Sequence, residues 1–206
     1  MKGVLNSALI LVLVGFVSCK PVDKNTFSHE YFNFEMQLPA DWNVQTEKEL
    51  NRISRTANGA FDDSESITET TADISGFAKI NILAAFQYEI GHDIAFNPSI
   101  TAMADNLKNT PSIQNAKDYL IRQKEILGRY EVLNYSCSEP VSASETIKSQ
   151  DFYTMKTEVK VDNSNIKQEY YTAVVKQFAL TFIISYTTDT ERDTLLESLK
   201  SIHFTK

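Results

Sequence analysis

Residues 166–204 decide the fold that this sequence predicts, and they read IKQEYYTAVVKQFALTFIISYTTDTERDTLLESLKSIHF. Within residues 178–186 large and small side chains alternate, which places every large side chain on one face of a strand. The opposite face is small and uncharged, so we expect it to be covered too, as in a central strand. A second strand, residues 166–175, precedes it across a tight turn at 176–177. The pattern therefore predicts an antiparallel hairpin of two long strands.

A helix follows this hairpin. We expect Thr190 to cap it, with Asp193 in the place of the capping-box acid. The helix has one apolar stripe, formed by Leu195, Leu196, Leu199 and Ile202. A hairpin with a helix across one face predicts the α+β class, an antiparallel β-sheet flanked by helices.

Further strands are predicted upstream by the same alternation of side chains. They cover residues 31–38, 77–88, 131–137 and 150–161. In the first strand, the side chains expected to face the core are Phe32, Phe34, Met36 and Leu38. The hairpin turn that follows the last of these strands is placed at residues 162–165.

Two longer helices are predicted between these strands, and residues 47–53 predict a short one. Asn97-Pro98 is typical of a helix start, and the expected stripe comprises Ile100, Met103, Ala104 and Leu107. Pro111-Ser112 is expected to open the second helix, which ends near Gly128. Residues 55–76 are polar and acidic, which predicts a solvated loop.

The N-terminus has the pattern of an export signal. Lys2 precedes an apolar run, residues 4–17, that is too short to span a bilayer. The run ends in Phe-Val-Ser-Cys, which resembles the lipobox of bacterial lipoproteins, whose cysteine is acylated and becomes the new N-terminus. Ordinary signal-peptidase cleavage is the alternative, but it needs a small residue where Phe16 stands. We expect a signal over residues 1–18 and lipid attachment at Cys19.

The remaining chain is expected to be a tether over residues 19–26 and one α+β domain over 27–206. Loss of Lys2 with the signal leaves 19 basic and 27 acidic residues, a formal charge of −8. Nucleic acids and anionic lipid surfaces attract cationic proteins, so neither is an expected partner. The expected contacts are the membrane, through the N-terminal lipid, and either a protein partner or a small ligand in the bacterial cell envelope.

Few residues carry candidate chemistry. His92-Asp93, after Gly91 in a predicted loop, is the pair with most catalytic character, while His29 and His203 are expected to pack or to lie at the surface. An envelope hydrolase or metal-dependent enzyme would need a distant partner for His92. Cys137, left alone once Cys19 is acylated, is expected to be a small buried apolar side chain.

Two further groups are weak candidates for binding sites. Asp62, Asp63 and Glu65 could hold a cation, but they lack the alternating spacing and central glycine of an EF-hand loop. Tyr170 and Tyr171 point to opposite faces of their strand, so one of them is a candidate for an exposed ligand or partner surface. The sequence holds no glycine-rich phosphate loop and no GxSxG, SxxK or CxxC motif. No cofactor and no catalytic residue are predicted.

Two stretches resemble the PsbP-like superfamily: an aromatic strand that runs into LPADWNV, residues 38–44, and the closing segment, residues 170–204. The resemblance implies an α/β/α sandwich, an antiparallel sheet with helices on both sides. The superfamily includes a photosystem II subunit, a nuclear transport factor and bacterial lipoproteins, mostly accessory or binding proteins. It has no shared catalytic motif to transfer. The turn at 176–177 lacks the expected glycine, and residues 55–76 have no counterpart. The combined hypothesis is a lipid-anchored, non-enzymatic accessory or binding protein of the cell envelope.

Overall fold

The computed structural model describes residues 25–46, 49–50, 78–129, 134–148, 150–161 and 164–205. Several predictions made from the sequence fall outside these ranges. They are the signal, Cys19 and the tether up to residue 24, most of the short helix at 47–53, and the acidic loop with Asp62, Asp63 and Glu65.

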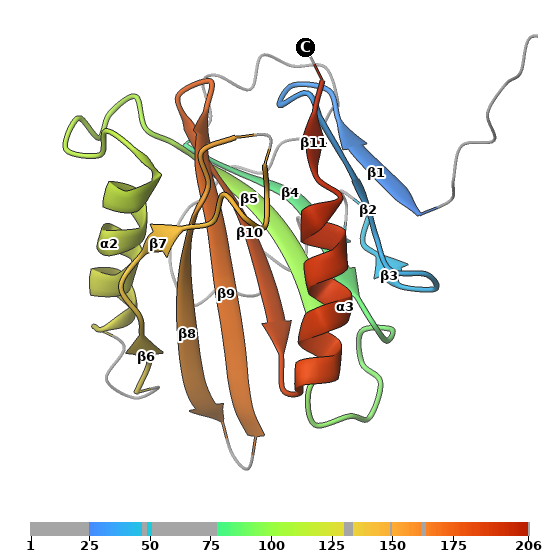
Figure 1. Cartoon of the computed structure of the whole chain (residues 1–206). Helices are drawn as coiled ribbons and strands as arrows, with labels where there is room; N and C mark the ends of the chain where they lie inside the picture. Colours follow the sequence, from blue (N-terminus) through green and yellow to red (C-terminus); the bar gives the residue numbers. More distant parts are fainter. Residues whose placement is uncertain are drawn as a thin grey trace, which may run out of the picture.

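The described residues form two antiparallel sheets and two helices (Figure 1). The small sheet has the order β1-β2-β11, and the large sheet has the order β3-β4-β5-β10-β9-β8-β6, with β7 also paired to β8. The strands are β1 (Thr26–His29), β2 (Phe34–Gln37), β3 (Asn43–Val44), β4 (Lys79–Phe86), β5 (Ser99–Asn106), β6 (Ser136–Cys137), β7 (Val141–Ser142), β8 (Tyr153–Val161), β9 (Ser164–Val175), β10 (Phe178–Tyr186) and β11 (His203–Phe204). The helices are α2 (Ala116–Leu127) and α3 (Asp189–Lys200).

The closing hairpin is confirmed as β9 and β10. Every residue of β10 is buried, and β10 pairs with β5 on one side and with β9 on the other, so it is a central strand. Lys176 and Gln177 have φ of 50° and 68°. Positive φ at both central residues is what a two-residue type I′ turn requires, so this turn forms without the usual glycine or asparagine.

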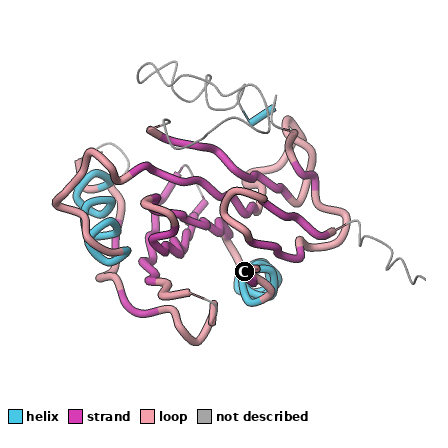
Figure 2. The backbone as a smooth tube through the Cα atoms, turned by 90° about the horizontal axis from the view of Figure 1, so that it is seen from above, coloured by secondary structure: helices cyan, strands magenta, loops and turns pink. Residues whose placement is uncertain are grey.

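The two faces of β10 are covered by different elements. Phe178, Phe182 and the other large residues pack with β2 and with Leu195 and Leu199 of α3. Ala179, on the opposite face, packs with Tyr119 and Leu120 of α2. Figure 2 shows strands of the large sheet between α2 and α3, with the small sheet on the α3 side. This arrangement is the antiparallel sheet with helices on both faces that the resemblance predicts.

The helix predicted after Asn97-Pro98 is wrong, because this segment is the strand β5. Ile100, Ala102 and Ala104 are buried at strand spacing and pair with Ile184, Phe182 and Leu180 of β10. Ile100 and Ala104 fit both a helical and a strand period, so the local pattern does not decide between them. Hydrogen bonding to both β4 and β10 decides in favour of the strand.

Both described helices begin at residues other than the predicted ones. Thr188, not Thr190, caps α3 and forms a full capping box with Glu191. Asn115, not Pro111-Ser112, caps α2, because its side chain accepts a hydrogen bond from the amide of Asp118. The predicted stripe of α3 is buried at Leu195, Leu199 and Ile202.

The N-terminal strand β1 is absent from the sequence prediction. It begins at Thr26, the last residue of the expected tether, and pairs with β2 along its whole length. The strand predicted over residues 31–38 begins only at Phe34, because a turn with positive φ at Asn33 precedes it. Its inward side chains, Phe32 to Leu38, are nevertheless buried as expected.

Candidate functional site

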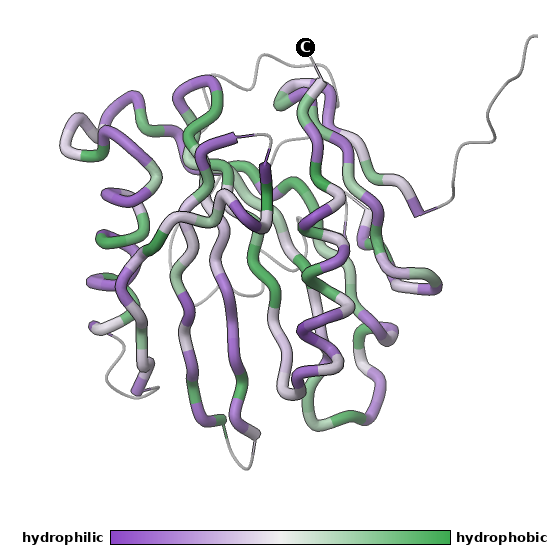
Figure 3. The backbone as a smooth tube through the Cα atoms, viewed as in Figure 1, coloured by the Kyte–Doolittle hydropathy of each residue, from purple (hydrophilic) through white to green (hydrophobic). Residues whose placement is uncertain are grey.

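A pocket of about 410 Å³ lies in the connection between β4 and β5. Its apolar wall comes from Phe86, Ile90, Ile94, Ala95 and Phe96, and its polar groups come from Glu89, His92 and Asn97. This volume is in the lower part of the range of about 300–1,000 Å³ that is usual for small-ligand sites. Figure 3 shows the apolar residues of this connection at the lower end of the molecule.

Hydrogen bonds hold this connection in one shape. The Asn97 side chain accepts from the Tyr88 amide at 3.0 Å and donates to the Tyr88 carbonyl at 2.8 Å. The Gln87 amide donates to the Pro98 carbonyl at 3.0 Å, and Gly91 supplies a residue with φ of 93°. Asn97, predicted to cap a helix, therefore closes the base of a loop.

Apolar and aromatic groups beside the pocket are exposed to solvent. Tyr88 is 41% exposed and Ile90 is 47% exposed. The His92 ring stacks on Tyr88, with ring centroids 5.8 Å apart and an interplanar angle of 7°. Exposed apolar groups next to a concave surface are typical of a binding site.

The structure places His92 at this pocket but does not complete a catalytic pair. His92 and Asp93 are both exposed. Among the hydrogen bonds of the described residues, none involves the His92 ring or the Asp93 carboxylate, and the ring contact of His92 is with Tyr88. Within the described ranges no three His, Cys, Asp or Glu side chains group as metal ligands.

The other histidines and the cysteine have packing or surface roles in the described structure. His29 stacks on Phe34 at a centroid distance of 6.1 Å, and burial lowers the pKa of its imidazole. His203 lies 3.3 Å from the Glu35 carboxylate at the exposed surface of the small sheet. Cys137 is half-buried, and burial raises the pKa of its thiol against the opposing effect of the Lys124 ammonium. A protonated, half-buried thiol agrees with the predicted packing role.

The predicted surface at Tyr170 and Tyr171 is not formed. Tyr171 is 2% exposed and points toward the α3 side of the sheet. Tyr170 is half-buried and packs with α2. Both faces of β9 are covered at this position, so neither ring is available as an exposed patch.

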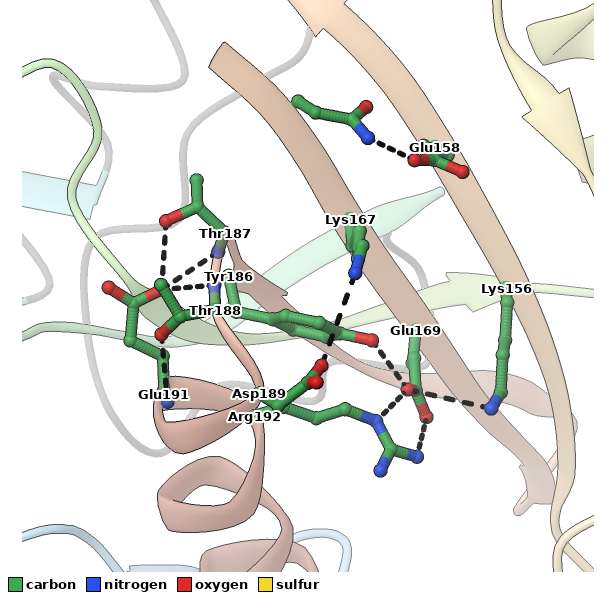
Figure 4. A network of polar contacts seen from close by, with 11 residues as sticks. Lys156, Glu158, Lys167, Glu169, Tyr186, Thr187, Thr188, Asp189, Glu191 and Arg192 are labelled. Carbon is green, nitrogen blue, oxygen red and sulfur yellow. Dashed lines mark hydrogen bonds and ion pairs between the residues drawn. The ribbon is translucent and has the colours of Figure 1, made fainter.

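A buried polar network that was not predicted from the sequence lies under the first turns of α3 (Figure 4). Glu169 of β9 is fully buried, and its carboxylate accepts hydrogen bonds from the hydroxyls of Tyr171 at 2.6 Å and Tyr186 at 2.7 Å. The Arg192 guanidinium of α3 donates to both carboxylate oxygens, and the Lys156 ammonium lies 3.8 Å away. The network connects α3 to three neighbouring strands, β8, β9 and β10.

The hydrogen bonds keep this carboxylate ionised. Burial would raise the pKa of Glu169, but the hydrogen bonds from Arg192, Tyr171 and Tyr186 together outweigh it, so the pKa lies below its usual range. Burial and the adjacent carboxylate raise the pKa of both tyrosines, which remain donors. All of these groups satisfy one another, so the network is a structural clamp on α3 and not an open binding site.

A signal for this network is present in the sequence. Glu169 shares its strand face with Tyr171 and Ala173, both of which are buried. A charged residue in line with core residues predicts a buried ion pair, and Arg192 lies in the helix that covers the same face.

No helix of the described residues has the length and apolarity that crossing a membrane requires. A scan against protein-family models finds no match, and a search of characterised proteins finds no similar sequence. Among solved structures, the solution structure of cyanobacterial PsbP (CyanoP) from Synechocystis sp. PCC 6803 is similar, with a TM-score of 0.52. The two chains share 12% sequence identity over 92% of this chain and 99% of that chain. The chain therefore has a PsbP-like α+β fold, as its resemblance to that superfamily predicts.

Proposed function

We propose that this chain is an exported, lipid-anchored binding protein of the bacterial cell envelope, without enzymatic activity, and that it binds a protein partner at the pocket between β4 and β5. The observation that carries this proposal is the pocket, with Ile90 exposed in its wall and Tyr88 exposed beside it. Water contact with apolar groups is unfavourable, and a partner that covers them gains the free energy of their burial.

The hydrogen bonds within the loop support the same proposal. A binding loop that is already held in shape loses less conformational entropy on binding than a free loop. The clamp by Asn97 and the bond from Gln87 to Pro98 fix both ends of the connection. Less of the free energy gained from apolar contact is therefore lost to ordering the loop.

A lipid at Cys19, as the sequence predicts, would hold the domain at a membrane surface. Acylation at Cys19 would leave six residues before β1, and seven Cα–Cα steps span at most about 24 Å. Such a tether would keep the domain next to the bilayer, where envelope proteins are within reach.

The anchor is tested by the intact mass of the protein purified from its native membrane. We expect cleavage before Cys19 and added acyl chains, both absent from a Cys19→Ala variant. An unacylated soluble species would contradict the lipid anchor. The protein would then be interpreted as a secreted protein.

The binding surface is tested by photo-crosslinking in the intact envelope. A benzophenone amino acid replaces Tyr88, which stacks on His92 of the pocket, and in the control it replaces Val141, which is 58% exposed on β7. We expect a discrete crosslinked band from position 88 that position 141 does not give. Equal labelling from both positions, or none from position 88, would contradict a partner at the pocket.

A further inference from the structure

We infer that the pocket binds an apolar side chain, aromatic or aliphatic, from a positively charged segment of its protein partner. This inference rests on the proposed function and adds the chemistry of the partner.

The charges at the pocket have one sign. Glu89 and Asp93 are exposed, and residues 86–98 contain no Lys or Arg. Neither carboxylate has an ion-pair partner among the described residues, as is also true of Glu145 and Asp151, whereas Glu139, Glu169 and Glu197 each have one. Two unpaired carboxylates beside an apolar wall favour a partner that presents cations around an apolar residue.

Of the five other exposed large apolar residues of the described surface, three lie near a basic residue in the sequence, and Val44 and Val141 do not. Val161 follows Lys160, Ile121 precedes Arg122, and Val174 lies two residues before Lys176. Ile90 and Tyr88 instead flank Glu89. The combination of exposed apolar groups with unpaired negative charge distinguishes the pocket from these three positions.

The volume of the pocket is large enough for one side chain. About 410 Å³ within a single loop accommodates one large side chain with its neighbouring backbone. The exposed Tyr88 ring also offers a π surface to a Lys or Arg of the same segment. An anionic membrane surface, the other apolar environment near a lipid anchor, would be repelled by Glu89 and Asp93.

The test uses three fluorescein-labelled pentapeptides, KKFKK, EEFEE and KKAKK, titrated by fluorescence anisotropy into the mature protein in non-ionic detergent. We expect saturable binding of KKFKK alone, weakened by added salt. A Glu89→Gln/Asp93→Asn variant is expected to bind KKFKK about three- to tenfold more weakly. The matched control, Glu145→Gln/Asp151→Asn, removes two exposed carboxylates elsewhere and is expected to bind as the wild type does.

Three results would overturn the inference and leave the proposed function intact. They are equal binding of EEFEE and KKFKK, equal binding of KKAKK and KKFKK, and no peptide binding by a protein that crosslinks through position 88. Failure of the crosslink at position 88 would instead contradict the proposed function itself, so the two claims fail separately.

Discussion

The network at Glu169 has a charged group in the core, whereas the pocket between β4 and β5 has apolar groups in solvent. At Glu169 a charge lies in the core, where Arg192 and two tyrosine hydroxyls satisfy it. At the pocket, apolar Tyr88 and Ile90 lie in solvent, next to carboxylates without ion-pair partners in the described structure. Groups that are paired within the protein stabilise the fold, and exposed groups without such contacts remain available to a partner. We therefore expect substitutions at the two places to separate stability from binding.

The largest effect on stability is expected from Arg192→Ala. The change leaves the fully buried Glu169 carboxylate without its main partner, and breaking a buried pair in this way costs about 3–5 kcal/mol. We expect a loss near 3 kcal/mol in the free energy of unfolding in urea, because Lys156 remains 3.8 Å away and both tyrosines still donate. Arg122→Ala, at an exposed position of α2, is the control and should change stability by less than about 0.5 kcal/mol. Equal effects of the two substitutions would show that the network does not hold α3.

Acid is expected to remove the stabilisation that the ionised Glu169 carboxylate gives to the fold. The pKa of Glu169 is lowered in the folded protein, so ionisation stabilises the fold above the unfolded pKa, about 4.3, and this stabilisation is lost as pH falls through the folded pKa. Wild type should therefore be more stable than Glu169→Gln at neutral pH, and the difference should shrink below about pH 4. Urea unfolding of both proteins from pH 7 to pH 3 measures this difference in the free energy of unfolding. A difference that stays constant over this range would contradict the ionised network.

An element is predicted correctly from the sequence when the contacts that determine it involve residues nearby in the chain. The alternation over residues 178–186 fits only a strand, so β10 and its hairpin are predicted well. In β5, Ile100 and Ala104 satisfy two periods, and the pairing that decides between them involves residues about 80 positions away. Local pattern cannot show that pairing, and the prediction of a helix there is wrong.

The same distinction applies to the sites. His92 is predicted in a loop, and it does lie in the loop that forms the pocket. Tyr88 is assigned to the strand by its alternation, although β4 ends at Phe86 and the ring is exposed. The Glu169 network depends on Arg192, which is brought to it by the docking of α3. Sequence spacing alone does not show this contact, and only the core-facing position of Glu169 indicates it.

An intermediate effect is expected from Asn97→Ala, which removes the two side-chain hydrogen bonds that close the loop and leaves the backbone bond from Gln87 to Pro98. The Tyr88 amide and carbonyl stay close to solvent, so we expect a loss of about 1 kcal/mol in stability. Binding of KKFKK should weaken as well, because more free energy is then lost to ordering the loop. Gln114→Ala, in the exposed segment before α2, is the control and should change neither quantity. Weaker stability with unchanged binding would show that the shape of the loop does not matter to the site.

The smallest effect on stability is expected where the effect on binding is largest. Tyr88→Ser removes an exposed ring whose intramolecular contact is the stack on His92, so the free energy of unfolding should change by less than about 0.5 kcal/mol. Binding of KKFKK should nevertheless weaken about tenfold, because the peptide loses both apolar contact and the π surface. Urea unfolding and anisotropy on the same preparation measure the two quantities. Tyr88→Ser could instead destabilise the fold as much as Arg192→Ala does. The Tyr88 ring would then contribute to the stability of the fold, as the Glu169 network does, and the two regions would not differ in the way proposed.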